Sequence, residues 1–542
     1  MNAFSHEQID AIFSAWANDE SPGCAVGIYS EGGILYKRGY GSANLEHGIS
    51  ITSSTVFHVA SLSKQFTATA IALLARSGRI SLDDDIRRYI PEISSAPPIT
   101  FRHIIHHTSG LRDQWDLLRL SGWRYADLKT TDDILRLAAR QTDLNFQTGT
   151  RFQYINTGYT LMGIAVERVT GLSLGEYSEE NVFKPLGMHD TFFQEDHQRI
   201  IKNRAQAYSR DSDGELHIDV PSYETVGPTG LFSTIEDFAR WERNLLSPMI
   251  GDEEFVRQLH TGGALADGKP ISYGFGLING QHRGLEIAEH AGGDAGYRAH
   301  FLRFPGEQFA VAIFSNFSEM KPGQLARKVA DICLAGRFPT EQADDTKAAT
   351  WGGRERGNYA SPAQDNESKC GSYRDALSGM TCRIEDRGGR LFLVSAEGGE
   401  YELTQAGDER FRFLEVDAEC LFKPSTDDQP SRMIVSYAGE ETGDCERIGD
   451  QQEEDSVRQL ADYVAAYQSD ELDCRYAIEL SDDGLILRRA KFGTCALVPL
   501  RRDEFSCQNE GLHLRFVRDE GGQVNEFVLS AERVWNVRFT RL

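Results

Sequence analysis

The chain carries His58-Val59-Ala60-Ser61-Leu62-Ser63-Lys64-Gln65-Phe66, an S-x-x-K spacing at the start of an apolar helical pattern. Ser61 and Lys64 share one face of the predicted helix, because residues three apart on a helix are neighbours. A helix N-terminus stabilises negative charge, and a lysine amine at this spacing reaches the serine hydroxyl. The spacing therefore predicts an activated serine nucleophile. A second copy, Ser318-Glu319-Met320-Lys321, is followed at once by Pro322 and is interpreted as a chance match.

Two further segments have the residue types that this kind of serine chemistry needs. Tyr154-Ile155-Asn156 lies in a predicted loop before a helix, and a phenol there can relay protons if a neighbouring ammonium lowers its pKa. Hydrolases with an S-x-x-K helix also have a K-T-G-like triplet on a strand. This chain has no K-T-G but has two H-x-G candidates, at His260 and at His290. We select His290-Ala291-Gly292 because it ends a strand-like run, whereas His260 ends a helical pattern.

Strand-like runs occur near both ends of residues 1–336, with helical patterns between them. The runs cover residues 24–29, 34–40, 285–289, 298–303 and 309–315, and helical patterns include residues 66–74 and 323–334. This order predicts a layered fold in which the terminal segments share one sheet.

Taken together, the three motifs resemble those of the serine β-lactamase / penicillin-recognising serine hydrolase superfamily, which includes class C β-lactamases, carboxylesterases and D-aminopeptidases. The matching positions are Ser61 with Lys64, Tyr154 with Asn156, and His290-Ala291-Gly292, and residues 107–111 and 227–231 are similar to family loops. The resemblance covers residues 1–336 and implies an α+β fold, a β-lactamase-like sandwich in which helices flank an antiparallel sheet. A catalytic domain followed by two β domains is most similar to the three-domain D-aminopeptidases, whose triplet is also H-x-G.

The resemblance implies a role for each matching residue. Ser61 forms an acyl-enzyme, Lys64 takes its proton directly or through Tyr154, and Tyr154 protonates the leaving group. The backbone N–H groups of Ser61 and Gly293 form the expected oxyanion hole. The expected catalytic set is Ser61, Lys64, Tyr154 and His290. Asn156 is expected to orient the substrate amide. The other expected substrate-binding residues are Gly292, Gly293, Asn279 and Trp115, with Asp294 as a further pocket candidate.

The H-x-G triplet narrows the predicted reaction. Histidine is mostly neutral at pH 7, so His290 removes the permanent cation that meets a substrate carboxylate in the family. We therefore expect a serine hydrolase of small amides or peptides, an aminopeptidase or amidase, with D-stereospecificity left open. A carboxylesterase with the same Ser/Lys/Tyr site is the alternative, and a non-catalytic binding protein is a remote one.

An aminopeptidase must also bind a free ammonium group. In the resembling D-aminopeptidases a loop of the last β domain enters the cleft for this purpose. The obvious C-terminal loops here, residues 490–494 and 507–511, are short, and the sequence does not identify the residue that binds the ammonium.

The C-terminal part of the chain contains an internal repeat. A shift of 94 residues, without gaps, superposes Tyr373 on Tyr467, Phe411 on Phe505 and further apolar positions over more than 60 residues. Each copy alternates short apolar runs with turns, the pattern of small antiparallel barrels. We predict four segments: a serine β-lactamase-like catalytic domain over residues 1–336, a linker over 337–368, and two lipocalin-like β-barrel domains over 369–450 and 451–542.

Composition and charge limit the partners. The 542 residues include 57 Lys and Arg against 82 Asp and Glu, a net charge of −25, and no basic stripe is present. Nucleic-acid backbones require clustered Lys and Arg, so we expect no nucleic-acid partner. The longest apolar runs are about ten residues, short of the ~20 that a membrane span needs, so we expect no membrane partner. The expected partner is a small-molecule or short-peptide substrate, and a homodimer is left open.

The cysteines and one histidine cluster give weaker signals. The nine cysteines are odd in number, no C-x-x-C pair exists and the N-terminus lacks a basic or apolar signal region, so we expect a cytoplasmic protein with free thiols. His103 and His107 have an H-x-x-x-H spacing but lack the glutamate of H-E-x-x-H zinc sites. We expect no metal and no cofactor.

Overall fold

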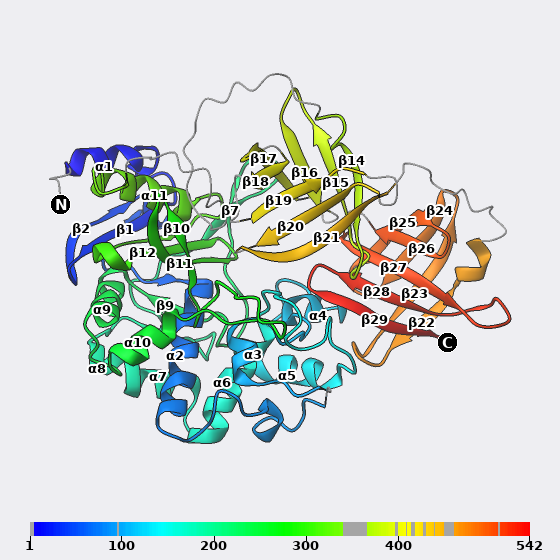
Figure 1. Ribbon diagram of the computed structural model, residues 1–542, viewed down its shortest axis with the longest axis horizontal. Helices are drawn as coiled ribbons and strands as arrows, with labels where there is room; N and C mark the ends of the chain where they lie inside the picture. Colours follow the sequence, from blue (N-terminus) through cyan, green and yellow to red (C-terminus); the bar gives the residue numbers. More distant parts are fainter. Residues whose placement is uncertain are drawn as a thin grey trace.

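One six-stranded antiparallel sheet joins the two ends of the first part of the chain. The structure, a computed structural model, describes residues 5–94, 97–339, 366–395, 399–407, 409–413, 418–425, 430–437, 439–448, 460–507 and 510–542. The strand order is β10-β11-β12-β13-β1-β2, so the N-terminal hairpin pairs with the last strand of this part (Figure 1). The strands are β1 (Cys24–Ser30), β2 (Gly33–Tyr40), β10 (Ile278–His282), β11 (Leu285–Asp294), β12 (Tyr297–Phe304) and β13 (Phe309–Ser315). The prediction that the terminal segments share a sheet is confirmed.

Helices cover both faces of this sheet. On one face, α1 (His6–Ile12) and α11 (Pro322–Cys333) bury apolar side chains against the strands. On the other face, α9 (Ile235–Leu246) lies on β1, β2 and β13, and α2 (Ser63–Arg76) packs against α6 (Thr157–Thr170) in the same core. This second layer holds the S-x-x-K helix, which is α2.

The remaining elements of this part are short. The helices are α3 (Phe101–Ile105), α4 (Gln114–Leu120), α5 (Thr131–Arg140), α7 (Leu174–Ser178), α8 (Lys184–Leu186) and α10 (Glu253–His260). Short helical turns are η1 (Ser14–Trp16), η2 (Ala60–Leu62), η3 (Ile86–Arg88), η4 (Glu179–Phe183) and η5 (Pro305–Glu307). Small sheets are formed by β3 (Ser42–Asn44) with β4 (Ile49–Ser50), by β5 (Phe57–His58), β9 (Leu231–Ser233) and β6 (Phe192–Phe193), and by β7 (Tyr208–Arg210) with β8 (Leu216–Ile218).

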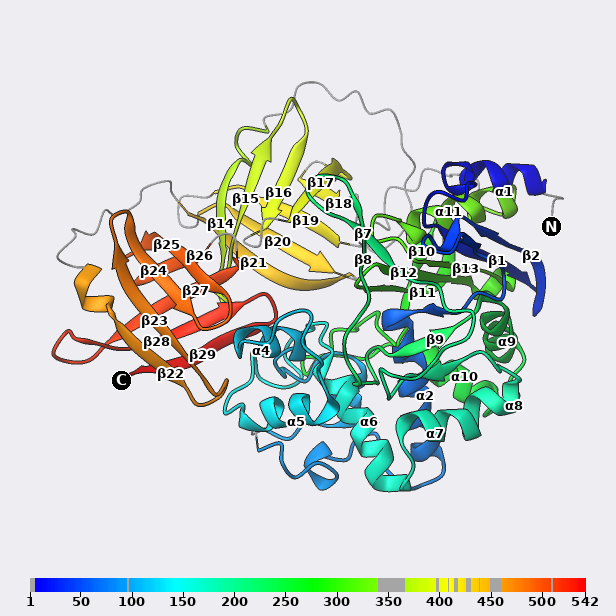
Figure 2. The same ribbon diagram turned by 180° about the vertical axis from the view of Figure 1, so that it is seen from behind.

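The C-terminal region forms two closed eight-stranded antiparallel barrels (Figures 1 and 2). The first barrel consists of β14 (Gly371–Asp375), β15 (Thr381–Asp386), β16 (Leu391–Ser395), β17 (Glu400–Gln405), β18 (Arg410–Phe413), β19 (Ala418–Lys423), β20 (Arg432–Tyr437) and β21 (Glu440–Ile448). The second barrel follows the turn η6 (Ala461–Tyr463) and consists of β22 (Ala465–Ser469), β23 (Cys474–Ser481), β24 (Gly484–Arg489), β25 (Gly493–Arg501), β26 (Glu504–Cys507), β27 (Leu512–Arg518), β28 (Val524–Ala531) and β29 (Val534–Arg541).

The sequence repeat has the same register as the two barrels. A shift of 94 residues carries β14 onto β22 and β18 onto β26 residue for residue, and each of the other six strands onto its counterpart within two residues at either end. The predicted architecture, an antiparallel sheet flanked by helices and followed by two small antiparallel barrels, is confirmed.

The two barrels pack on the rest of the chain in different ways. The core of the second barrel is continuous with α4 and α5, where Leu117, Leu120 and Leu137 join the barrel's own apolar side chains in one cluster. The core of the first barrel is a separate cluster made of its own residues. In both ribbon views the second barrel lies beside α4 and α5 (Figures 1 and 2).

One cysteine pair differs from the expectation of free thiols. Cys495 on β25 and Cys507 on β26 form a disulfide, with Cα atoms 6.1 Å apart. The two strands are neighbours in the barrel, and an odd cysteine count without a C-x-x-C pair does not reveal that proximity. The other seven cysteines are free.

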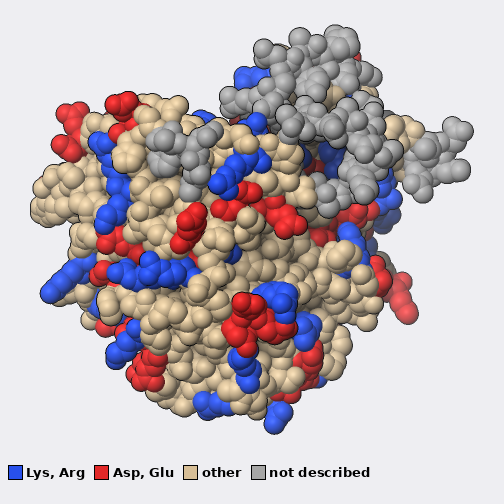
Figure 3. All heavy atoms as spheres, turned by 60° about the vertical axis from the view of Figure 1, so that its left-hand side comes forward, with Lys and Arg blue, Asp and Glu red and all other residues tan. Residues whose placement is uncertain are grey.

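Two further expectations concern the linker and the surface. The predicted linker, residues 337–368, lies largely outside the described residues. Within the described ranges, no helix combines the length and the apolar character that a membrane crossing requires. On the face shown in Figure 3, acidic and basic side chains are interspersed and form no single basic area.

Candidate active site

Ser61 lies where a strand gives way to a helix. The chain passes from β5 through η2 into α2, so Ser61 precedes a buried helix and Lys64 lies in its first turn. Ala60, directly before Ser61, has a left-handed φ of 47°. Such a backbone is unfavourable for a residue with a Cβ and is found mainly where the surrounding structure enforces it, often at functional turns. The helix N-terminus thus presents the Ser61 hydroxyl, as the S-x-x-K spacing predicts.

The amine of Lys64 is buried among three oxygen atoms. Nζ lies 3.1 Å from Ser61 Oγ, 2.9 Å from Asn156 Oδ1 and 3.0 Å from the carbonyl oxygen of Pro228. Burial lowers the pKa of Lys64 well below its usual value, which favours the neutral amine. A neutral amine has two N–H donors and one lone pair. With the two N–H groups donated to the two carbonyl oxygens, the lone pair faces the Ser61 hydroxyl and is placed to accept its proton.

Tyr154 is a second side chain next to the serine. Ser61 is among the groups that affect the pKa of its phenol, and the Lys64 Nζ atom lies 4.7 Å from the centre of its ring. Burial raises the pKa of Tyr154 well above its usual value, and Tyr437 raises it further. The prediction that a neighbouring ammonium lowers the pKa of Tyr154 is not met, because a neutral Lys64 has no such effect. Tyr154 is therefore protonated and is a proton donor.

Asn156 connects Lys64 to a buried carboxylate. Its Oδ1 accepts from Lys64, and its Nδ2 and backbone N–H donate to Asp113 Oδ2 at 3.0 and 2.7 Å. Arg533 Nη1 lies 3.4 Å from the same carboxylate oxygen. After burial, the Asp113 charge raises the pKa of Lys64 and the Arg533 charge lowers it. Arg533 comes from the turn between β28 and β29, so a side chain of the second barrel reaches the network that holds Lys64.

The first barrel also reaches the site, through the residues where β20 ends and β21 begins. Tyr437, the last residue of β20, has its ring 6.2 Å from that of Tyr154. Glu440, the first residue of β21, accepts the backbone N–H of Ser272 at 3.2 Å. The C-terminal loops considered from the sequence, residues 490–494 and 507–511, contain neither Tyr437 nor Glu440. The repeat was an available signal, because the 94-residue shift relates residues 437–440 to residues 531–534.

His290 is a neutral imidazole with both nitrogens engaged. Nδ1 lies 2.6 Å from its neighbour's carbonyl oxygen, Ala291 O, and therefore carries the proton. Nε2 is 2.9 Å from the Tyr273 hydroxyl and accepts from it. Burial lowers the pKa of His290 to about 3. Tyr273 was not singled out from the sequence, because a tyrosine in a loop without a motif carries no signal.

Strand β11 packs closely on the nucleophile segment. A Cβ at Gly292 would overlap the carbonyl oxygen of Val59 and stand 3.3 Å from Ser61 N. Only glycine permits this close approach of β11 to the segment that carries Ser61.

The other two predicted binding residues lie outside this network. The Nδ2 atom of Asn279 donates to the carbonyl oxygens of His260 and Ser272, at 2.7 and 2.9 Å. These bonds use both amide hydrogens, so Asn279 fixes the backbone at the start of the sheet. Trp115, on α4, packs against Tyr223 with ring centres 5.4 Å apart and contacts the core of the second barrel.

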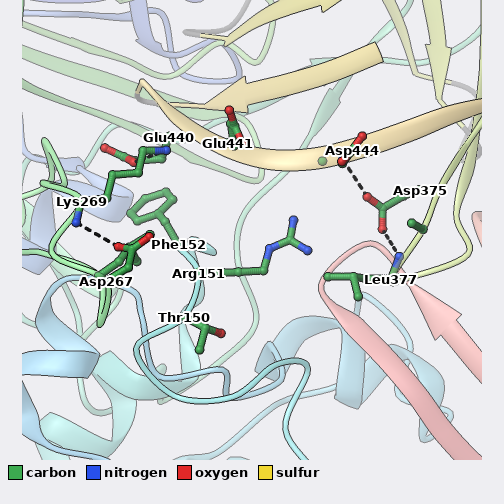
Figure 4. Close-up of a pocket in the computed structure, with 13 residues that line it drawn as sticks. Thr150, Arg151, Phe152, Asp267, Lys269, Asp375, Leu377, Glu440, Glu441 and Asp444 are labelled. Atoms are coloured by element: carbon green, nitrogen blue, oxygen red, sulfur yellow. Dashed lines mark hydrogen bonds and ion pairs between the residues drawn. The ribbon is translucent and has the colours of Figure 1, made fainter. Parts of the chain in front are cut away.

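A recess of about 320 Å³ lies at the junction with the first barrel. It adjoins the segment that leads to Tyr154, and Figure 4 shows Arg151 extending into it. Arg151 donates to the carbonyl oxygen of Thr442 at 3.1 Å. The lining residues are Thr150, Arg151, Phe152, Leu265, Asp267, Lys269, Asp375, Ala376, Leu377, Glu440, Glu441, Gly443 and Asp444. The excess of carboxylates makes this recess acidic.

The histidines of the H-x-x-x-H segment have partners of their own. His103 Nδ1 is 3.1 Å from Thr100 Oγ1, and His106 Nδ1 is 2.7 Å from the carbonyl oxygen of Tyr273. His107 Nδ1 accepts the backbone N–H of Ile155. Among the described residues, the one group with ligand atoms close enough together to hold a metal is Asp196, His197 and Glu224, which is largely exposed.

Comparisons with known proteins identify a family and similar relatives. A family model described as Beta-lactamase matches residues 9–334. A D-aminopeptidase of Gluconobacter oxydans (strain 621H) is 26% identical over 447 residues, 81% of this chain and 82% of the relative. Penicillin-binding protein 4* of Bacillus subtilis (strain 168) is 26% identical over 434 residues, 76% of this chain and 93% of the relative. The octameric penicillin-binding protein homologue from Pyrococcus abyssi aligns with a TM-score of 0.56 and 23% identity over 81% of this chain and 99% of that one, which shows a shared fold.

Proposed function

The chain belongs to the Beta-lactamase family, and on that premise we propose that it cleaves amide bonds of small amino-acyl amides or peptides through an acyl-enzyme on Ser61. The family and the D-aminopeptidase relatives make it a serine hydrolase. The amide substrate, the free amino end and the covalent intermediate are the parts that we add.

The observation that carries the proposal is the position of the Lys64 amine. Its two carbonyl partners and its depressed pKa leave a lone pair directed at Ser61 Oγ, 3.1 Å away. A neutral amine at this distance acts as a general base, and the serine then attacks the substrate carbonyl carbon.

Acylation follows from the positions of three side chains. Lys64 takes the proton from Ser61 as Oγ bonds to the carbonyl carbon, and the carbonyl electrons move to its oxygen. The N–H groups of Ser61 and Gly293 are our candidates for binding that oxyanion, each worth roughly 3–4 kcal/mol. The carbonyl re-forms as the C–N bond breaks, and the Tyr154 phenol gives its proton to the departing amine.

Deacylation uses the same groups. The proton held as Lys64 ammonium returns to the Tyr154 phenolate, which restores both groups to their starting forms. Lys64 then takes a proton from a water molecule, and the resulting hydroxide attacks the ester carbonyl. Ser61 Oγ leaves with the proton that Lys64 holds, so protons and charge balance over the cycle.

The neutral His290 supports an aminopeptidase or amidase over a carboxypeptidase. Its pKa of about 3 leaves the imidazole uncharged at neutral pH, and both nitrogens are engaged. We assign His290 to positioning Tyr273 and the end of β11. It provides no cation for a substrate carboxylate. The similarity to D-aminopeptidases supports a preference for D-amino-acyl substrates.

The test uses the purified protein with D-alanine and L-alanine p-nitroanilides. We expect turnover, faster for the D-enantiomer, and its loss by at least ~10³-fold in Ser61→Ala, because the residual rate no longer includes the nucleophile. p-Nitrophenyl butyrate tests the carboxylesterase alternative in parallel. Fast ester hydrolysis without turnover of either anilide, by a folded protein, would replace our proposal with that alternative.

A further inference from the structure

The end of β11 carries a carboxylate that the proposed chemistry does not use. Asp294 Oδ2 accepts hydrogen bonds from Thr229 Oγ1 at 3.1 Å, from His58 Nε2 at 3.2 Å and from the Tyr223 hydroxyl. Burial raises the pKa of Asp294, but these hydrogen bonds outweigh that effect and hold the pKa below its usual value. The carboxylate is therefore ionised at neutral pH.

Only one oxygen of this carboxylate is used. All three donors reach Oδ2, and no donor among the residues that the structure describes bonds to Oδ1. The Asp294 side chain keeps 22% of its surface exposed, whereas the His58 side chain that holds it is 1% exposed. An ionised carboxylate that is fixed through one oxygen and open at the other suits a ligand with charged N–H donors.

The carboxylate lies close to the nucleophile. His58, which holds it, is three residues before Ser61. Gly292 is on the same side of β11 as Asp294, since side chains two apart on a strand share a face, and its Cβ position is 3.3 Å from Ser61 N. The charge of Asp294 also raises the pKa of Lys64. An amino-acyl amide keeps its ammonium two bonds from the carbonyl carbon, so the group that binds it must be near Ser61.

The surroundings of the open oxygen suit a cation. Tyr223, which donates to the carboxylate, packs against Trp115 with ring centres 5.4 Å apart, and aromatic faces attract cations. The neighbouring cation, Arg298, is engaged with the backbone. Its Nη1 donates to the carbonyl oxygens of Ala295 and Tyr297, each at 2.7 Å.

We infer that Asp294 binds the free primary ammonium of the acyl part of the substrate through its open oxygen. The inference rests on the proposed function and names the group that selects unblocked amino-acyl amides. Replacing the ammonium by an uncharged hydroxyl keeps the size of the substrate and removes the charge-assisted hydrogen bond. The enzyme therefore distinguishes alanyl from lactyl amides, and Asp294 is the reason.

The experiment compares Asp294→Asn with the wild type on two matched substrates, alanine p-nitroanilide and lactic acid p-nitroanilide of the better enantiomer. A lost hydrogen bond to a charged group lowers kcat/KM for the alanyl substrate by about 10–150-fold, mainly through KM. We expect the lactyl substrate to change by less than about threefold, because it never used that bond. Asp252→Asn is the control, since this carboxylate pairs with Arg76 at the C-terminal end of α2, the end away from Ser61.

Each outcome has a distinct meaning. Equal losses on both substrates would show that Asp294 only anchors His58, and an alanyl preference that survives in Asp294→Asn would place the ammonium elsewhere. A wild type that hydrolyses the lactyl substrate as fast as the alanyl one overturns the inference and leaves the acyl-enzyme proposal standing. Turnover of neither substrate overturns both. If Asp294→Asn melts well below the wild type, Asp294→Ser is measured with the same pair.

Discussion

The two barrels are copies of one fold, yet they contribute different chemistry to the same site. Strand β20 ends at Tyr437, which packs near Tyr154, whereas the turn after β28, the counterpart of β20, holds Arg533, which faces Asp113. The 94-residue shift relates the two turns, so both copies use the same part of the barrel. One supplies an aromatic ring and the other a cation. The architecture of the repeat places the turns, and the residues on them set the function of each copy.

The copies also differ in how firmly they are attached. The second barrel shares a core with α4 and α5, and the buried Arg112 donates to Glu471 Oε1 at 2.7 Å and to the carbonyl oxygen of Trp535 at 3.0 Å. The first barrel has its own core and meets the site through Tyr437 and Glu440. We infer that the second barrel is an integral part of the catalytic unit, whereas the first barrel is attached to it less firmly.

The largest expected effect comes from breaking the buried ion pair of the second barrel. Arg112→Met leaves Glu471 buried and unpaired, and removing one partner of such a pair typically lowers the free energy of unfolding by about 3–5 kcal/mol. Urea unfolding followed by circular dichroism measures this. Arg151→Met, which removes a hydrogen bond to Thr442 of the first barrel and a contact with the Trp535 ring of the second, is the comparison variant and is expected to lose at most about 1 kcal/mol.

The pH dependence of this interface has a defined sign. Burial raises the pKa of Glu471, but Arg112 and two backbone N–H groups outweigh it, so the folded pKa lies below the usual 4.5. The stabilisation is fully present above pH 4.5 and is lost as the pH falls through the folded pKa. Equal unfolding free energies for the two arginine variants, or no difference in their acid sensitivity, would contradict the distinction between the barrels.

A smaller effect is expected on catalysis from Arg533→Met. Without this cation the Asp113 charge raises the pKa of Lys64, so the neutral base forms only at higher pH. We expect the acid limb of the kcat/KM profile to move up by about one pH unit and the activity at pH 7 to fall about tenfold. Arg533→Lys keeps the charge and restores most of the profile. Arg488→Met, which alters an exposed pair with Glu479, is the control.

A loss of activity that does not depend on pH would contradict the electrostatic role of Arg533. If Arg533→Met lowers activity equally at all pH values, Arg533 acts only by holding the barrel in place and not through the charge on Lys64.

The smallest effect is expected from Tyr437→Ala in the first barrel. Removing the ring opens the apolar surface around Tyr154 to water, and we expect kcat/KM to fall by about three- to fivefold through looser positioning of the phenol. Tyr437→Phe keeps the ring and is expected to retain more activity than Tyr437→Ala. A loss in Tyr437→Ala as large as that in Arg533→Met would mean that the first barrel is as integral to the site as the second.

The features that could be predicted from the sequence are those that depend on local residue patterns. Ser61 and Lys64 are one helical turn apart, and the register of the barrels follows from a repeat without gaps. The contacts of Arg533 and Tyr437 could not be predicted, because they depend on how the barrels dock and no motif marks a docked turn. The role of His290 was only partly visible, since its neutrality follows from residue type but its engagement by Tyr273 requires the fold.

The central claim is that Ser61 is a nucleophile activated by a neutral Lys64. A fluorophosphonate probe followed by peptide mass spectrometry tests it directly, because the probe bonds covalently to an activated serine. The account predicts one adduct, on the peptide that contains Ser61, with a labelling rate that rises with pH as Lys64 loses its proton and that collapses in Lys64→Met. Absence of labelling in the folded protein, or labelling that persists in Ser61→Ala, would contradict it.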